Sequence, residues 1–180
     1  GLGVLSNIPG DAKPVACIED TAVLIEDLPE YIKEFSEMMK QFNQTAVYYA
    51  HAGAGEIHLR PILNLKSPKD RKLFYEISEA SAKLVKKYGG SLSGEHGDGR
   101  VRASFIPLMI GDQNYQLLKD IKETWDSKGV FNVGKIVNAP PMLEDLRYEE
   151  NQKALNVPTK FNFDWSNGIL GAAELCNGSG

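Results

Sequence analysis

The three histidines of the chain lie in two glycine-rich segments rather than on an amphipathic stripe. His51 and His58 flank a segment that contains Ala-Gly-Ala-Gly, and His96 follows Glu95 in a second segment. Two imidazoles and one carboxylate are a common ligand set for a divalent transition metal that keeps open positions for a substrate. Adjacent residues rarely both ligate one ion in a tight loop. We therefore expect Glu95 to be the ligand and His96 to remain available for proton transfer near neutral pH.

The spacing of these residues leaves other interpretations open. A histidine beside a turn is more often a surface or structural residue, and glycine-rich turns usually serve chain reversal. A metal-dependent hydrolase would use Glu95 as the base toward a metal-bound water. A non-catalytic ferredoxin-like binding module would need none of these side chains for chemistry.

The local geometry decides whether His51 and His58 can share an ion. In a helix the two imidazoles would lie two turns, or roughly 10 Å, apart along the axis, which is too far for metal–nitrogen bonds of about 2 Å. At a strand–turn–strand junction the two side chains converge instead. Alternation along the second strand then puts three polar side chains on one face: Glu56, His58 and Arg60. We expect that face to be open, with a second domain and a ligand against it.

The elements that position these residues follow from hydrophobic periodicity and capping signals. In chain order we expect a strand over 14–24, a helix over 28–43, strands over 46–50 and 56–63, a helix over 68–88, a short strand, and helices over 101–109 and 112–125. This βαββαβ order predicts an α+β fold: a ferredoxin-like antiparallel sheet with helices on one face, followed by C-terminal helices and an extended tail.

Composition excludes several classes of function. The chain has 180 residues, 42% of them hydrophobic and 24% charged, which is ordinary for one globular domain. A net charge of −4 gives no basic field for nucleic acid. No apolar run reaches the length of about 20 residues that a transmembrane segment needs. The two cysteines form no disulfide framework, which favours the cytoplasm, with peripheral membrane association also allowed.

Three motifs carry a resemblance to a known family. Residues 50–58 are similar to Gly-His-x-Gly-Asp-Gly-Asn-x-His, and residues 93–99, Ser-Gly-Glu-His-Gly-Asp-Gly, contain Glu-His-Gly. Residues 131–136, Phe-Asn-Val-Gly-Lys-Ile, are similar to Phe-Asn-Pro-Gly-Lys-Ile. Together the motifs resemble the C-terminal, substrate-capping domain of FAD-linked oxidases of the D-lactate dehydrogenase and glycolate oxidase type, in the vanillyl-alcohol-oxidase superfamily. We expect that domain over residues 1–138, and a linker or tail over 139–180 that leads toward a truncated iron–sulfur region.

The resemblance implies an FAD-dependent dehydrogenase that oxidises a small D-2-hydroxy acid, of the lactate or glycolate kind, to the 2-keto acid. A divalent metal (Zn, Mn or Fe) would bind the substrate, and His96 would be the general base. The metal ligands implied are His51, His58 and Glu95. FAD would be bound mainly by an N-terminal flavin domain absent from this chain, with Asn132 and Lys135 close to it. Electrons would pass to a downstream acceptor, and the chain alone is expected to be inactive.

Several residues depart from the family pattern or are ambiguous. Four positions replace the usual Gly, Asp, Asn and Pro: Ala50, Ala54, Glu56 and Val133. These departures leave the metal and the substrate open, since they change the surroundings of the histidines. Arg60 is interpreted either as a ligand of the substrate carboxylate or as an exposed strand arginine.

The two cysteines have different expected roles. The sequence before Cys176 resembles the approach to an iron–sulfur ligand set in proteins that fuse this oxidase to a ferredoxin-like region, whereas an ordinary exposed cysteine is the alternative. A cluster needs about four cysteine thiolates. Cys17 lies in an expected strand and is predicted to be buried. The first and last residues, Gly-Leu-Gly and Cys-Asn-Gly-Ser-Gly, suggest a fragment of a longer protein.

Overall fold

The computed structural model describes residues 7–8, 10–153 and 157–176 and has an α+β architecture. The strands are β1 (Lys13–Pro14), β2 (Thr21–Ala22), β3 (Ala46–His51) and β4 (Glu56–Leu63). The α-helices are α2 (Leu28–Gln41), α3 (Pro68–Lys87), α4 (Ile106–Ile110), α5 (Asp112–Trp125) and α6 (Ile169–Glu174). The predicted fold class, α+β, is confirmed. Among the described residues, no helix combines the length and the apolar character needed to cross a membrane.

Strand β4 is the centre of the sheet. It pairs with β3 along one edge, and the short strands β1 and β2 pair with its two ends along the other edge, all antiparallel. The pairing of β3 with β4 places Tyr49 opposite His58 and His51 opposite Glu56. The sheet therefore brings the two histidines of the first glycine-rich segment to one end of a tight hairpin.

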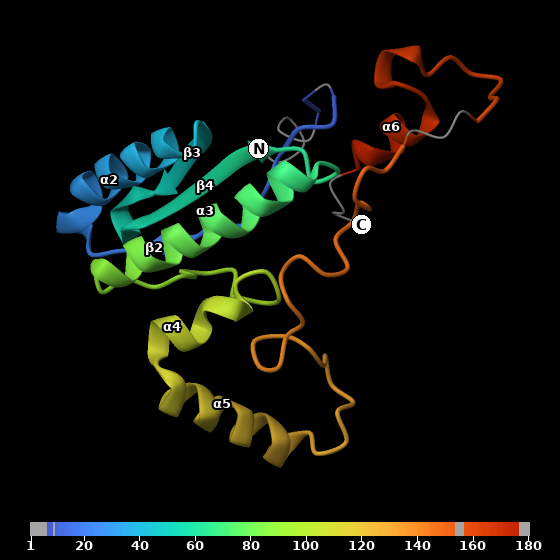
Figure 1. Ribbon diagram of the computed structural model, residues 1–180. Helices are drawn as coiled ribbons and strands as arrows, with labels where there is room; N and C mark the ends of the chain where they lie inside the picture. The colour runs from blue at the N-terminus through green and yellow to red at the C-terminus, as the bar shows by residue number, and fades with distance from the viewer. Residues whose placement is uncertain (1–6, 9, 154–156, 177–180) are drawn as a thin grey trace.

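The hydrophobic core lies between β4 and the two long helices, α2 and α3, which run beside the sheet (Figure 1). Alternate β4 side chains enter this core because side chains on a strand point to opposite faces in turn. The helices supply apolar residues at three- and four-residue spacing, as an amphipathic stripe requires. The fully buried members include Tyr31, Phe35, Met39, Leu59, Leu63, Ile77 and Val85.

Most elements lie where the sequence predicts them, and the first strand is the main difference. The expected strand over 14–24 is two short pieces, because the segment between β1 and β2 leaves the sheet and Asp20 has a φ of 77°. After α3, Gly89 has a φ of 64°, as a helix-ending glycine should. Ser91 then forms a single antiparallel bridge with Ala22. The ferredoxin-like topology stays a prediction, since its last strand corresponds to this one bridge.

The C-terminal part of the chain, from α5 onward, is less buried than the part before it. Helix α5 contains no buried residue, and among the described residues no α-helix lies between it and α6 (Figure 1). Met142 nevertheless packs into the main core, and Lys66 bonds to Glu174 at 2.9 Å. The expected boundary near residue 138 stays a prediction. The predicted start of this domain at residue 1 lies outside the described residues. Residues 177–180, at the end of the predicted tail, also lie outside them.

Candidate metal and proton-transfer site

A tight turn between β3 and β4 sets the relation of His51 to His58. His51 ends β3, residues Ala52–Ala54 form a single 3-10 turn, and Gly55 closes it with its amide bonded to the Ala52 carbonyl at 3.0 Å. The two imidazole centroids then lie 5.3 Å apart at 80°. His51 is exposed, whereas His58 is buried and stacks on Tyr49 at 4.7 Å. The predicted convergence of the two side chains across this junction is confirmed.

Gly55 is the position at which this turn tolerates no side chain. Its φ is 70°, and a Cβ there would lie 2.0 Å from the Val23 carbonyl oxygen. We expect Gly55→Ala to lower the free energy of unfolding by about 2–3 kcal/mol, because it adds a clash to an unfavourable backbone conformation. Gly53→Ala is the matched control, since a Cβ at Gly53 meets no atom within 4 Å. Urea unfolding of both variants checks this, and equal stabilities would contradict it.

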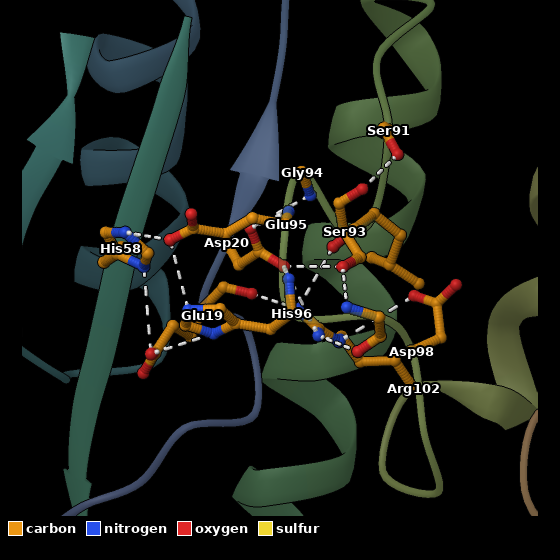
Figure 2. A network of polar contacts seen from close by, with 12 residues as sticks. Glu19, Asp20, His58, Ser91, Ser93, Gly94, Glu95, His96, Asp98 and Arg102 are labelled. Carbon is orange, nitrogen blue, oxygen red and sulfur yellow. Dashed lines mark hydrogen bonds and ion pairs between the residues drawn. The ribbon is translucent and has the colours of Figure 1, made fainter. Parts of the chain in front are cut away.

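Asp20 fixes the second glycine-rich segment against the sheet (Figure 2). Its carboxylate accepts hydrogen bonds from the amides of Gly94 at 3.0 Å, Glu95 at 2.7 Å and His96 at 2.8 Å, and from the Ser93 hydroxyl at 2.5 Å. Asp20 is fully buried. Burial alone would raise the pKa of Asp20, but these hydrogen bonds hold it well below its usual range. One buried carboxylate therefore determines where Glu95 and His96 stand.

Removing this carboxylate should loosen the whole segment. Asp20→Asn replaces an acceptor of four hydrogen bonds with an amide whose NH2 group faces backbone donors. We expect the free energy of unfolding to fall by about 3 kcal/mol, the value of one or two charge-assisted hydrogen bonds. Asp120→Asn is the control, since Asp120 accepts one exposed bond from Gln116. Chemical denaturation at neutral pH measures the free energy of unfolding of both variants. If Asp20→Asn lost no more stability than Asp120→Asn, the role of Asp20 would be contradicted.

Three imidazole nitrogens converge on one carboxylate oxygen of Glu95. Its Oε1 lies 3.5 Å from Nε2 of His51, 3.7 Å from Nε2 of His58 and 3.2 Å from Nε2 of His96. The side chains of Glu95 and His96 are about half exposed. Figure 2 shows His58 on β4 facing Glu95 and His96 on the second glycine-rich segment. The four residues predicted as ligands and base thus lie in one cluster that is open to solvent on one side.

The residues His51, His58 and Glu95 fit a divalent metal. Each offers a ligand atom within 4.8 Å of the others, and ligand atoms around a tetrahedral ion are roughly 3.4 Å apart for bonds of about 2.1 Å. Burial lowers the pKa of His58, which favours the neutral imidazole that ligates a metal. Nδ1 of His58 is buried without a hydrogen-bond partner among the described residues.

Two other groups of the described residues are equally compact: Glu19 with His58 and His96, and Asp20 with Glu56 and Glu95. Both are less suited to a metal. Glu19 already faces the Arg60 guanidinium, whose positive charge opposes a divalent ion. The carboxylate of Asp20 is committed to four hydrogen bonds from the glycine-rich segment.

The face of β4 that carries Glu56, His58 and Arg60 is not open, which corrects the sequence-based expectation. The three residues are 7%, 3% and 5% exposed. The Glu19–Asp20 segment covers them, together with the glycine-rich segment that Asp20 holds. Burial, the contact with Asp20 and the charge of Glu95 together raise the pKa of Glu56 to about 7.

Arg60 is buried. Its guanidinium forms an ion pair with Glu19, and it lies over the Tyr49 ring at 5.7 Å. The interpretation of Arg60 as an exposed strand residue is therefore wrong, and its role toward a substrate carboxylate stays a prediction. Arg102 is also buried and donates to the carbonyl groups of Glu19 and Gly97, so it braces the same two segments.

The other predicted site residues lie outside this cluster. Asn132 and Lys135 are exposed in the loop after α5, among the exposed apolar side chains of Phe131 and Val133. This loop is tied to the second glycine-rich segment by a 2.7 Å bond from the Ile136 amide to the Gly99 carbonyl. Cys176 is exposed after α6, where its carbonyl accepts a bond from Arg147.

Cys17, Glu19 and Asp20 lie in the segment that joins β1 to β2. Cys17 is buried as predicted, and burial raises the pKa of its thiol to about 12. Glu19 and Asp20 were missed as site residues. The available signal was a pair of adjacent acids inside a stretch that otherwise reads as a buried strand, where charges need partners.

An α+β domain in which three histidines and a glutamate from two glycine-rich segments share one cluster offers a ligand set that a divalent metal accepts. Residues 2–136 match the family model described as FAD linked oxidases, C-terminal domain. The chain belongs to this family.

Known relatives agree with the family match. The chain is 34% identical to D-2-hydroxyglutarate dehydrogenase of Escherichia coli, in an alignment that covers 99% of this chain and 17% of the relative. It is 38% identical to D-2-hydroxyglutarate dehydrogenase of Pseudomonas putida over 75% of this chain and 13% of the relative. It is 33% identical to D-lactate dehydrogenase of Archaeoglobus fulgidus over 51% of this chain and 20% of the relative. The chain thus spans a fifth or less of the length of these relatives.

Proposed function

We propose that this chain is the substrate-capping part of an FAD-dependent dehydrogenase that oxidises a D-2-hydroxy acid to the 2-keto acid. The observation that carries the proposal is the convergence of three imidazole Nε2 atoms on Glu95 within 3.7 Å. Family membership supports the flavin, and the names of the relatives support the substrate class. The hydrolase and the non-catalytic module have no comparable support.

In this proposal His51, His58 and Glu95 hold a divalent metal. The bound ion would supply Lewis-acid polarisation of the hydroxyl and carboxylate oxygens of the substrate. Zn, Mn and Fe all accept a set of two imidazoles and one carboxylate. Because the site opens to solvent at the half-exposed side chain of Glu95, we expect the isolated chain to bind the ion more weakly than the whole protein does.

His96 is the proposed base toward the substrate hydroxyl. Its Nε2 lies 3.2 Å from Glu95 Oε1, so it reaches the same space as the proposed metal ligands. A neutral imidazole there accepts the hydroxyl proton. FAD would supply the redox chemistry by accepting the hydride equivalent. Asp20 keeps Glu95 and His96 in one orientation through their backbone amides.

The flavin domain is proposed to cover the α5 side of the chain. Helix α5 and the following loop expose Ile121, Trp125, Val130, Phe131 and Val133 by 56–83%. Apolar side chains exposed together on a helix and the loop that follows it are typical of an interface surface. Asn132 and Lys135 lie in this surface, which supports the proposal that they approach the flavin. The proposal also includes a domain boundary at residue 138 and an iron–sulfur ligand role for Cys176. It further includes an electron acceptor beyond that cluster, and a cytoplasmic location with peripheral membrane association.

The substrate class is tested in the full-length protein loaded with FAD and Zn²⁺. Flavin reduction is followed without oxygen after addition of D-2-hydroxyglutarate, D-lactate, glycolate or L-2-hydroxyglutarate. We expect reduction by at least one D-2-hydroxy acid or glycolate and none by the L isomer. The isolated chain, mixed with free FAD, should give no reduction. Failure of every 2-hydroxy acid to reduce the flavin in the metal-loaded protein would contradict the proposal.

A further inference from the structure

Glu19 stands between two of the three histidines on the side away from Glu95. Its Oε1 lies 3.4 Å from Nδ1 of His96 and 3.8 Å from Nδ1 of His58. The imidazoles of His58 and His96 stack with centroids 5.3 Å apart at 30°. Both rings therefore point Nδ1 toward Glu19 and Nε2 toward Glu95. Nε2 of His58 also lies 3.5 Å from Oε1 of Glu56.

Arg60 determines which oxygen of Glu19 is left for the histidines. The guanidinium pairs with Oε2 of Glu19, and the side chains of both residues are 6% exposed. Arginine is a donor-only group that stays charged in proteins. It therefore keeps Glu19 oriented with Oε1 toward the imidazoles, and it offsets the cost of burying this carboxylate.

The imidazole of His58 needs such a partner. His58 is 3% exposed, and its Nδ1 has no hydrogen-bond partner among the described residues. A buried N–H without an acceptor is costly, and Oε1 of Glu19 faces this nitrogen at 3.8 Å. A displacement of less than about 1 Å closes the gap to hydrogen-bonding distance. Metal-ligating histidines commonly donate their second nitrogen to a carboxylate, which fixes the tautomer and the ring orientation.

We propose that Glu19, held by Arg60, is a positioning residue that fixes both His58 and His96 as the Nδ1–H tautomer and so leaves both Nε2 lone pairs free. For His58 this lone pair is directed to the metal, and for His96 it is directed to the substrate proton. One carboxylate thus prepares the ligand and the base together. This inference rests on the proposed function, because the ion and the substrate belong to it.

Glu19→Gln is the sharpest test because it keeps the shape of the side chain and replaces one acceptor oxygen with an NH2 donor. Arg60 donates only, so it takes the amide oxygen of the new Gln and turns the NH2 group toward the two Nδ1 atoms. An NH2 group there favours unprotonated Nδ1, and His58 and His96 should change to the Nε2–H tautomer. That form has no lone pair for the metal at Nε2. An inverted amide has the same tautomer consequence in the serine protease triad, where the wrong tautomer abolishes most of the activity.

The tautomers are read from the 15N imidazole shifts of the metal-free chain at about pH 8, above the ordinary imidazole pKa. The chain has only three histidines, so His→Gln variants assign each ring. We expect Nδ1–H at His58 and His96 in the natural sequence, the Nε2–H form at both in Glu19→Gln, and no change at His51. Zn²⁺ affinity should fall by about 10- to 100-fold in Glu19→Gln. Glu34→Gln is the matched control, since Glu34 pairs with Lys87 and Tyr88 away from the site.

Each result has a defined meaning. The Nε2–H tautomer at His58 in the natural sequence would overturn the inference without any variant, even if Glu19→Gln failed to fold. Unchanged tautomers in a folded Glu19→Gln chain would overturn it as well. Absence of Zn²⁺ binding by the natural sequence would instead count against the proposed metal site, while the tautomer measurement would still decide the role of Glu19.

Discussion

Replacing Glu95 with glutamine is expected to weaken Zn²⁺ binding by the chain at least about 100-fold, more than the loss of an outer partner of a metal ligand usually costs. The carboxylate supplies the only negative charge in the proposed ligand set, and its Oε1 is the atom on which the three Nε2 atoms converge. Glutamine keeps the size and the backbone bond to Asp20 but removes the charge. Isothermal titration with Zn²⁺, or competition with a chelating dye, measures the affinity.

Glu76→Gln is the control for this substitution. Its side chain is 39% exposed, comparable to the 47% of Glu95, and it pairs with Lys72 on helix α3. Loss of a surface ion pair of this kind costs little. We expect the natural affinity in Glu76→Gln. Equal affinities for Glu95→Gln and the natural sequence would show that Glu95 is not a ligand, and would leave the cluster as an ordinary polar surface.

The second large effect is expected from His96→Gln in the full-length, FAD-loaded protein. Removal of a general base lowers kcat by about 10²- to 10⁴-fold. KM should change little, because the proposed metal ligands remain, and with them the ion that would bind the substrate. The rate of anaerobic flavin reduction by the best D-2-hydroxy acid measures the effect.

Metal content separates the role of a base from the role of a ligand. His96→Gln should retain the metal, whereas Glu95→Gln should lose both the metal and the activity. Retention of the natural kcat by His96→Gln would contradict the base assignment. Loss of the ion in that variant would make His96 a ligand, as the compact group of His96 with Glu19 and His58 allows.

Local rules were enough to predict the hairpin that carries His51 and His58. Alternation in β4 and the glycines of the turn required a strand–turn–strand junction, and the structure has one. The proximity of Glu95 and His96 to that hairpin came from the resemblance, because nothing in the spacing joins segments about 40 residues apart. The resemblance could name these residues but could not say what positions them.

Glu19 and Asp20 could not be placed from the sequence because their partners are distant in the chain. Asp20 bonds to amides 74–76 residues further along, and Glu19 faces Arg60. Periodicity predicts which face a residue occupies, but it does not predict what covers that face. For the same reason the β4 face with Arg60 was expected to be open and is buried.

Anomalous diffraction at the zinc edge, from crystals of the chain grown with Zn²⁺, tests the central assignment most directly. We expect one strong peak within about 2.0–2.2 Å of Nε2 of His51, Nε2 of His58 and a carboxylate oxygen of Glu95. A strong peak held by other residues, or these three side chains well ordered with no peak between them, would contradict it.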